Sequence, residues 1–448
     1  MKAALFIDDR NVGGLPDWGV IYEMVHNKWR YDRYLRGIHR EAESEKVSFW
    51  GRLFGGNKKQ FTMSVASKSK AGCCGCNACA EICPKHCINM VKDAKGFLYP
   101  KVDTASCNNC GLCIKCCPWG KNNVTFHAPL KAFAAWNRDH DEYLASSSGG
   151  AAHVLSLHIL SLGGVVYGCT SDDMKIRHIR VTKQEELYKL QGSKYVQSDV
   201  CGLYKQVKTD LKASIPVLFI GTPCQVAGLK NYIKNIPEHL FLVDLICHGV
   251  PSQQMLHEHI SRIAKGRTAE RLSFRKGQTF RMEIRGTSMR YGVAKPWHYA
   301  CEPHKDMYYR AFLNGISYRE SCYHCKFAQP ERVGDITIGD FWGLQEREKF
   351  PPETKEGISV LLPSSIKGLQ LIFSIKSALH ITERSISEAI KGNTQLRRSS
   401  IQGRRSRLFG LLYPMVSFDM AMNIVVADYK AIRKVKDFIH NLRYVRSR

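Results

Sequence analysis

Two groups of cysteines dominate the chemistry that this 448-residue sequence offers. Each group reads C-x2-C-x2-C-x3-C and is followed by proline, a spacing at which thiolates bind [4Fe-4S] clusters. In such repeats the fourth cysteine serves the other cluster, so both motifs should form one unit that holds two adjacent clusters. The predicted first ligand set is Cys73, Cys76, Cys79 and Cys117, and the second is Cys107, Cys110, Cys113 and Cys83.

The cysteine count and the lack of apolar spans bear on the compartment and on the metal. The chain has 18 cysteines, which in a reducing compartment argue for metal rather than for disulfides. No secretory signal opens the sequence and no apolar run is long enough to span a bilayer, so a cytoplasmic protein is expected. Zinc is the alternative metal, although three closely spaced cysteines followed by C-P fit its usual sites poorly. Cys74, Cys87 and Cys116 exceed the ligand count and are expected to be packing residues or spare thiols.

Residues 71–125 should fold as an α+β ferredoxin-type module with two [4Fe-4S] clusters, and the sequence after them has a different pattern. Short β-branched runs alternate with helical stretches, which indicates an α/β domain with a largely parallel sheet over residues 131–392. The runs predicted to be strands include 164–167, 217–220 and 240–246, and the predicted helices include 151–162, 199–211 and 253–264.

Several loops that follow these strands carry reactive or phosphate-binding residue types. Because ligands of such sheets bind at the carboxyl ends of the strands, the loops 146–150 (SSSGG), 221–225 (GTPCQ) and 247–249 (CHG) are candidate site elements. Ordinary helix capping is the alternative for the Ser-rich and Thr-Pro stretches. A C-x2-C pair further along, by itself suited to zinc or redox work, completes a set of four thiols that we predict to hold a third cluster. These four are Cys224, Cys247, Cys322 and Cys325.

Taken in order, the motifs resemble the coenzyme F420 hydrogenase/dehydrogenase β-subunit family in the form that carries an N-terminal ferredoxin module. The resemblance extends over residues 71–361 and rests on SSSGG, VYG at 166–168, QGSKYVQS at 191–198, GTPCQ, CHGVPS, and SCYHC with GDITIGDFWG at 334–343. It implies an iron-sulfur flavoprotein in which FAD exchanges a hydride with coenzyme F420 or another substrate, while clusters carry single electrons. It also supports the third [4Fe-4S] cluster. Some bacterial members are associated with polysaccharide biosynthesis, so the substrate is a small molecule or a glycan-linked intermediate.

The flavin must be held without a known dinucleotide fingerprint, because neither G-x-G-x-x-G nor a P-loop occurs in the chain. Phosphate contacts are predicted for the SSSGG loop, and contacts to phosphate or to the isoalloxazine carbonyls for Lys194. His248 is the candidate proton donor, with a structural histidine as the alternative, and Asp340 is a candidate ligand of a hydroxyl group or a turn cap. The full predicted set for cofactor binding and catalysis is Ser148, Gly149, Gly150, Ser193, Lys194, Thr222, Gln225, His248 and Asp340.

The formal net charge of +26 suggests an anionic partner. Three clusters and an FAD would reduce it to roughly +18, since each cluster with its thiolates and the flavin phosphates carry about −2. Much of the positive charge lies in residues 393–448, which are predicted to be partly helical and to present a solvated basic face. An acidic redox partner, such as ferredoxin or another oxidoreductase subunit, or peripheral contact with an anionic membrane fits this charge. Nucleic acid is not expected, because the basic residues lack interleaved stacking aromatics.

Residues 1–70 form an extension without an assigned activity. The segment FIDDRNVGGLPDWG resembles the C-terminal end of a haloacid dehalogenase-type phosphatase, in which Asp8 and Asp9 would match a magnesium-assisting pair. A fragment of this length lacks the phosphatase core, so we interpret it as a fusion remnant or as upstream of a start at Met63.

Two other classes of function remain open from the sequence. A pure electron-transfer subunit would hold the clusters but no flavin, and the reaction would take place on another chain. A zinc-dependent nucleic-acid binder would use the cysteines structurally, and its binding would weaken steeply with salt.

Overall fold

The computed structural model describes residues 64–65, 68–120, 123–277, 279–290, 293–345, 350–351, 354–355 and 357–427. The chain divides into two compact units, Met1–Phe61 and Thr62–Arg448. All features below belong to the second unit. Almost all of the extension predicted over residues 1–70, with Asp8 and Asp9, and the last part of the basic tail, 428–448, lie outside the described residues.

The cysteine-rich segment consists of two one-turn helices and an antiparallel hairpin. Each helix starts after a residue with a left-handed backbone, Asn77 (φ 66°) and Gly111 (φ 71°), so the chain turns sharply just beyond a cysteine. The short helices contact each other, which places the two cysteine motifs side by side. The elements are α3 (Ala78–Glu81), β1 (Ile88–Lys92), β2 (Leu98–Val102) and α4 (Leu112–Lys115).

An eight-stranded mixed sheet forms the centre of the unit, in the order β13-β3-β12-β11-β7-β6-β4-β5. Strands β4, β6, β7 and β11 run parallel to their neighbours within this group, and all other pairs are antiparallel. The strands are β3 (Ala132–Asn137), β4 (Val165–Thr170), β5 (Arg177–Val181), β6 (Val217–Gly221), β7 (Leu240–Leu245), β11 (Ile336–Asp340), β12 (Ser359–Pro363) and β13 (Leu379–Arg384).

The prediction of a largely parallel sheet is therefore correct only for the four central strands. Parallel neighbours need a long crossover connection, usually a helix. Only the short turn η3 (Asp172–Met174) joins β4 to β5, so β5 returns antiparallel. At the other edge, β3 inserts between β12 and β13 and runs antiparallel to both.

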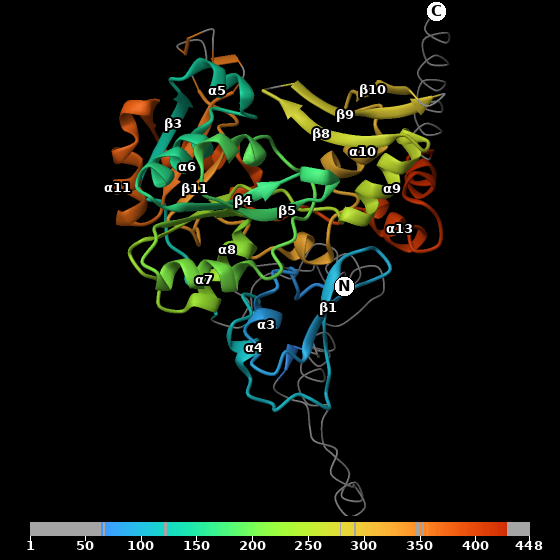
Figure 1. The fold of residues 1–448 in the computed structure, drawn as a ribbon, viewed down its shortest axis with the longest axis horizontal. Coiled ribbons are helices and arrows are strands. Elements are labelled where there is room, and N and C mark those ends of the chain that lie inside the picture. Colours follow the sequence, from blue (N-terminus) through green and yellow to red (C-terminus); the bar gives the residue numbers. More distant parts are fainter. Residues whose placement is uncertain are drawn as a thin grey trace, which may run out of the picture. The chain divides into compact units, whose positions relative to one another are not determined.

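Helices cover both faces of the sheet, and the alternation of side chains along each strand explains why. Val165 and Tyr167 of β4 pack with α7 and α8, whereas Val166 packs with α6 and α11 on the opposite face. Cys76 and Ala78 join the core on the α7–α8 side, so the cysteine-rich segment packs against this face (Figure 1). The helices are α6 (Ala151–Ser161), α7 (Leu203–Lys212), α8 (Pro223–Ile233) and α11 (Ile366–Ser374).

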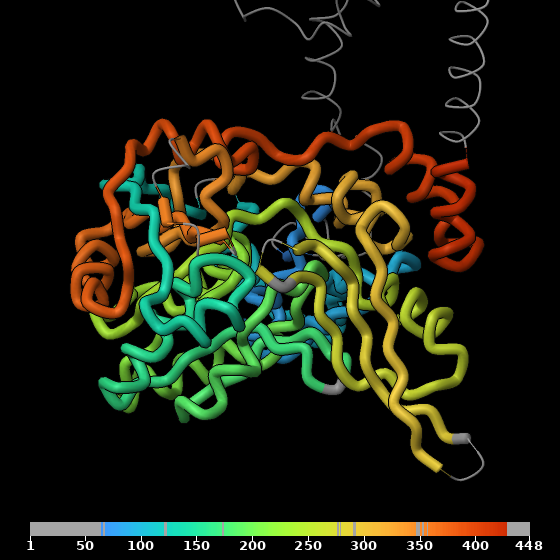
Figure 2. Tube along the Cα trace, turned by 90° about the horizontal axis from the view of Figure 1, so that it is seen from above, coloured from blue at the N-terminus to red at the C-terminus, as the bar shows by residue number. Residues whose placement is uncertain are grey.

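A second, three-stranded antiparallel sheet packs with helices from distant parts of the sequence. Its strands run side by side and extend beyond the adjoining elements (Figure 2). Phe274, Met255, Tyr308 and Phe409 bring the strands and three helices into one core, so the described part of the basic tail is packed and partly helical. The elements are β8 (Thr268–Lys276), β9 (Thr279–Arg290), β10 (Val293–Cys301), α9 (Gln253–Ala264), α10 (Met307–Leu313) and α13 (Arg404–Leu412).

Short elements connect these layers. Two of them, α5 and α12, pack beside β3 and β12, and η5 carries Cys322, with Cys325 directly after its end. These connecting elements are α5 (His140–Ala145), η4 (Gln184–Leu190), η5 (Glu320–His324), η8 (Lys376–Ala378), α12 (Ile386–Gly392) and η9 (Thr394–Leu396).

Candidate functional site: thiol-lined cavities at the sheet edge

The carboxyl ends of β6, β7 and β11 lie at one edge of the sheet, because these strands are parallel. Thr222 follows β6 and caps α8, while Cys247 lies two residues beyond β7. The η5 segment with Cys322 reaches the same edge. Parallel topology therefore brings loops that are about a hundred residues apart in sequence to a common place, as ligand sites of such sheets require.

A cavity of about 720 Å³, part of it open to solvent, lies among these loops. The four thiols predicted to hold a third cluster all line it, together with a fifth from the cysteine-rich segment. The C-terminal part of the chain closes one side, where Ser400 Oγ donates a hydrogen bond to the His248 carbonyl at 2.7 Å. The cysteines are Cys74, Cys224, Cys247, Cys322 and Cys325.

The crowding of these thiols is visible in their acidity. Burial raises the pKa of Cys247 to about 12, and the neighbouring Cys224 and Cys325 add to the shift. Burial likewise raises the pKa of Cys325 to about 11. Buried thiols that suppress each other's ionisation are poor nucleophiles, because the thiolate is the reactive form.

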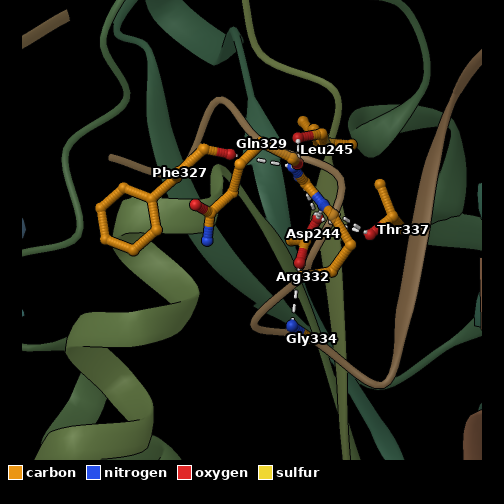
Figure 3. A network of polar contacts seen from close by, with 7 residues as sticks. All are labelled: Asp244, Leu245, Phe327, Gln329, Arg332, Gly334 and Thr337. Carbon is orange, nitrogen blue, oxygen red and sulfur yellow. Dashed lines mark hydrogen bonds and ion pairs between the residues drawn. The ribbon is translucent and has the colours of Figure 1, made fainter. Parts of the chain in front are cut away.

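A buried ion pair holds the cavity loops in place. Arg332 lines the cavity and donates to Asp244 Oδ1 of β7 through Nη2 at 2.6 Å, while its Nη1 binds the Phe327 carbonyl at 2.9 Å (Figure 3). Asp244 also accepts from the Gly334 backbone N–H and from the Thr337 hydroxyl, both at 2.8 Å. The loop that carries the C-x2-C pair is thereby fixed to two central strands.

The helix that presents Cys224 starts with a capping box. The Thr222 backbone N–H donates to Gln225 Oε1 at 3.0 Å, and the Thr222 side chain accepts from the Gln225 backbone. Both residues were predicted to bind the cofactor, and both line the cavity, but their polar groups already satisfy each other. Their visible role is to orient the first turn of α8 and hence the thiol of Cys224.

The two cysteine motifs of the N-terminal segment lie close together. Cys76 has Cys117 and Cys79 as electrostatic neighbours, and Cys79 in turn has Cys116, Cys73, Cys117 and Cys113. A second cavity is lined by the other predicted set, Cys83, Cys107, Cys110 and Cys113, with Cys87 added. Cys117 lies near the first motif and Cys83 lines a cavity with the second, while the crossed ligand sets and the binding of iron remain predictions.

The first of these groups abuts the cavity at the sheet edge. Cys74 lies in the same cavity as Cys224 and helps to raise the pKa of that thiol, and Cys76 packs so closely on α8 that a Cβ at Gly228 would lie 3.0 Å from its sulfur. Arg319 donates to the Cys73 carbonyl at 2.7 Å and lines the same cavity. The cysteine-rich segment and the mixed sheet therefore share a junction made of thiols and one guanidinium.

The SSSGG loop lies at the end of β3 and begins α6. Gly149 packs against backbone, since an added Cβ would lie 2.1 Å from the Ala135 carbonyl oxygen, and Gly150 has a positive φ of 76°. These contacts explain both glycines without a ligand. Ser148 differs, because its buried hydroxyl has no hydrogen-bond partner among the described residues. A hydroxyl of this kind beside the N-terminus of α6 suits an anion.

Ser193 and Lys194 lie next to this loop but are engaged by protein groups. The Ser193 backbone N–H donates to Ser147 Oγ at 2.8 Å. The Lys194 ammonium donates to the carbonyls of Leu190 and Gln191 at 3.0 and 2.7 Å, and burial lowers its pKa.

Asp340 and His248 occupy different surroundings. Asp340, at the end of β11, forms a bidentate ion pair with Arg275 of β8 and so connects the two sheets. His248 lines the thiol cavity with its side chain exposed, although the protein atoms around its ring lower its pKa. Of the predicted cofactor and catalytic residues, only Thr222, Gln225 and His248 line this cavity, whereas the SSSGG loop, Ser193, Lys194 and Asp340 do not.

Residues that the sequence did not single out also line these sites. Cys74 and Cys87, predicted to be packing residues or spare thiols, each lie in a cysteine-lined cavity. Arg319 lies three residues before Cys322, so its position beside the SCYHC motif was the available signal. Ser399 and Ser400 belong to the tail predicted to be a solvated basic face, and no local pattern indicated that they cover a cavity.

Comparison with known proteins gives similarities of three kinds. Residues 216–389 match the family model described as coenzyme F420 hydrogenase/dehydrogenase, C terminus of the beta subunit. Over 100 residues the chain is 26% identical to NADH-quinone oxidoreductase subunit I of Pelobacter propionicus, covering 20% of this chain and 53%, about half, of that relative. A chain of the F420-reducing [NiFe] hydrogenase complex of Methanosarcina barkeri, from a xenon-derivatised structure, is 13% identical with a TM-score of 0.38. That match covers 60% of this chain and 91% of the other.

These findings support iron-sulfur redox electron transfer as the class of function. The similarity to the coenzyme F420 hydrogenase/dehydrogenase β-subunit family is carried by residues 216–389. This segment contains Cys224, Cys247, Cys322 and Cys325. In the part of the chain that the structure describes, no helix is both long and apolar enough to cross a membrane.

Proposed function

We propose that the protein is an iron-sulfur flavoprotein oxidoreductase. It moves electrons between two ferredoxin-type [4Fe-4S] clusters, a third [4Fe-4S] cluster in the sheet-edge cavity, FAD, and a two-electron substrate. The substrate is coenzyme F420 or a related small molecule, or a glycan-linked intermediate of polysaccharide biosynthesis. An acidic ferredoxin or another oxidoreductase subunit exchanges the single electrons.

The observation that carries this proposal is that four thiols from three separate segments line one cavity beside the cysteine-rich segment. Cys224, Cys247, Cys322 and Cys325 all line the cavity, and Cys74 contacts Cys224 from the segment that holds the two cysteine motifs. Electron transfer between clusters needs such closeness. The donor set also suits iron, because thiolates are the ligands of iron-sulfur clusters.

The fit of FAD rests on fewer residues than the sequence suggested. The unpartnered Ser148 hydroxyl at the N-terminus of α6 supports a phosphate seat. Lys194 and Asp340 have protein partners, so we assign them to positioning of their loops rather than to flavin contacts. Bound flavin would supply the conversion between a hydride and single electrons. His248 is exposed at the cavity, where its imidazole could carry the proton that is exchanged with the substrate.

The test is the cofactor content of anaerobically purified protein. We expect about twelve irons, a matching amount of sulfide and one FAD per chain, since each cubane contributes four irons. Replacement of Cys224 by serine should lower the iron content to about eight while the two ferredoxin-type clusters remain. Cys74→Ser is the matched control, because this thiol lies in the same cavity but outside the ligand set, and it should retain about twelve irons.

A result of about eight irons in the wild-type protein, unchanged by Cys224→Ser, would refute the third cluster. Loss of iron in Cys74→Ser but not in Cys224→Ser would instead show that Cys74, and not Cys224, is the cluster ligand.

A second candidate function is a non-catalytic electron-transfer subunit. The similarity to NADH-quinone oxidoreductase subunit I favours it, because that relative is named as a subunit of a larger enzyme. Such a subunit would contain the clusters without flavin, so about twelve irons and no FAD would decide for it.

A further inference from the structure

Arg319 is a fully buried cation at the junction of the cysteine-rich segment and the mixed sheet, with 0% of its surface exposed. Its Nε donates to the Cys73 carbonyl and its Nη2 to the Leu98 carbonyl, both at 2.7 Å. Nη1 donates to Gln197 Oε1 at 3.1 Å, and the guanidinium lies over the Tyr99 ring at 4.2 Å. All these partners are neutral, so they fix the position of the guanidinium without compensating its charge.

No carboxylate lies within ion-pair distance of Arg319 in the described residues. Other deeply buried guanidinium groups of this chain do have one, such as Arg332 with Asp244 and Arg275 with Asp340. Removing a cation from water costs several kcal/mol unless an opposite charge is near. The folded protein should therefore contain a negative charge beside Arg319 that the side chains alone do not show.

The sulfur atoms around Arg319 indicate where that charge resides. Nη2 lies 3.6 Å from the Cys73 sulfur, within hydrogen-bond range for sulfur. Arg319 also lines the thiol cavity, and its charge acts to lower the pKa of Cys224. Cys322, three residues along the chain, is another of its electrostatic neighbours. Arg319 thus touches one predicted cluster site and faces another.

We propose that Arg319 is the shared counter-charge of two clusters, those of Cys73 and of Cys224, and that it raises the reduction potentials of both. A [4Fe-4S] core with four thiolates carries about −2 when oxidised and gains one further negative charge when one electron is added. A fixed cation stabilises the reduced form more than the oxidised form, and the N–H···S contact acts in the same direction. This inference rests on the proposed function, because it requires both clusters.

The cations nearest to the same cavity are less suited to this role. Arg332 is neutralised by Asp244, and Lys326 is partly exposed, so water screens its ammonium. The outer cysteine group consists of Cys83, Cys107, Cys110 and Cys113. It includes the exposed Cys110 and has no described contact with Arg319. Its cluster therefore provides an internal reference within each variant.

The experiment is a redox titration of Arg319→Met, Arg319→Gln and Arg319→Lys in which electron paramagnetic resonance monitors the reduction of each cluster. In the Met and Gln variants, the reduction equilibria of the two adjacent clusters should shift at least tenfold towards the oxidised state. This corresponds to a fall of about 59 mV in the reduction potential of each cluster. The outer cluster should be unchanged. Arg319→Lys should stay close to wild type, since it retains the charge and loses only the planar hydrogen bonds.

Two controls separate charge from packing. Arg267→Met removes a guanidinium that likewise binds carbonyls and covers an aromatic ring, but its partners Ala264, Ile263 and Trp297 include no cysteine. Gln197→Met removes a neutral partner of Arg319 and leaves the charge in place. Both should preserve all three potentials.

The wild-type iron count tests the cluster sites, and the potentials test Arg319, so the two failures are distinguishable. Unchanged potentials in iron-replete Arg319→Met would overturn the inference. So would an equal shift in Arg319→Lys, because geometry rather than charge would then be responsible. If the neutral variants assemble no clusters, Arg319→Lys decides. Wild-type potentials in it support the counter-charge, and failure to assemble overturns it.

Discussion

Arg332 and Arg319 line the same cavity, yet their surroundings differ in one respect. Arg332 forms an ion pair with Asp244, so the buried positive charge on the β7–β11 side of the cavity is neutralised by a carboxylate of the same chain. Arg319, on the side of the cysteine-rich segment, has neutral oxygen partners and thiols but no carboxylate among the described residues. On one side the buried charges are balanced by side chains of the chain itself, whereas on the other a buried cation has a position that suits the negative charge of the proposed clusters.

The largest effect on the free energy of unfolding is expected from breaking the Arg332–Asp244 ion pair. Asp244→Asn leaves the Arg332 guanidinium buried without a counter-ion and should lower the free energy of unfolding by about 3–5 kcal/mol. Urea unfolding under anaerobic conditions measures it. The double variant Asp244→Asn with Arg332→Met removes both charges and should recover much of the loss. A single-variant loss below about 1 kcal/mol would remove the distinction between the two sides.

His259, on helix α9 beside the three-stranded sheet, tests by its pH dependence whether a buried cation is stabilised by carboxylates of the chain. His259 lies between Asp306 and Asp419, both at 2.9 Å. Burial opposes its charge, but hydrogen bonds to both carboxylates outweigh burial and raise its pKa to about 9. Because this pKa is above the unfolded value of about 6.5, the stabilisation is complete below pH ~6.5 and is lost as the pH rises through ~9.

The expected contribution is about 3 kcal/mol, since one pKa unit corresponds to 1.36 kcal/mol. Urea midpoints measured between pH ~6 and ~10 should fall more steeply for the wild-type protein than for His259→Gln. The difference between the two curves isolates His259 from the cysteines and tyrosines that titrate in the same range. Parallel curves would show that His259 is neutral in the folded protein.

Asp340 gives the smallest of these effects and sharpens the comparison, because its partner Arg275 is buried while the carboxylate is partly accessible. Asp340→Asn should cost about 2 kcal/mol of unfolding free energy through loss of a charge-assisted hydrogen bond. Flavin content should not change, since the carboxylate is engaged by Arg275 rather than free for a cofactor. Loss of FAD at unchanged stability would restore the role that the sequence suggested.

The sequence predicted those parts of the structure that depend on local spacing. The β-branched runs located β4, β6 and β7. Cys224 and Cys247 were expected at one edge of the sheet because they follow predicted strands, and the C-x2-C spacing singled out Cys322 and Cys325; all four line one cavity. The capping alternative held for Thr222 and Gln225, because a capping box is a local pattern.

The remaining features depend on contacts between distant segments. The insertion of β3 between β12 and β13 joins residues more than two hundred positions apart, so the mixed sheet could not be seen in the alternation of strands and helices. The carbonyl partners of Lys194 and the ion pair of Asp340 occupy groups that appeared available for a cofactor. The isolation of Arg319 from carboxylates is likewise visible only once the fold is known.

The predicted crossed pairing of the cysteine motifs has a consequence for assembly on the ribosome. In the predicted ligand sets Cys117 belongs to the first group and Cys83 to the second, so neither set is complete until the second motif has been translated. The predicted sheet-edge set is complete only once Cys325 has left the exit tunnel. Clusters bound as proposed would therefore be inserted together at the two N-terminal sites, and at the third site only after most of the central sheet has been synthesised.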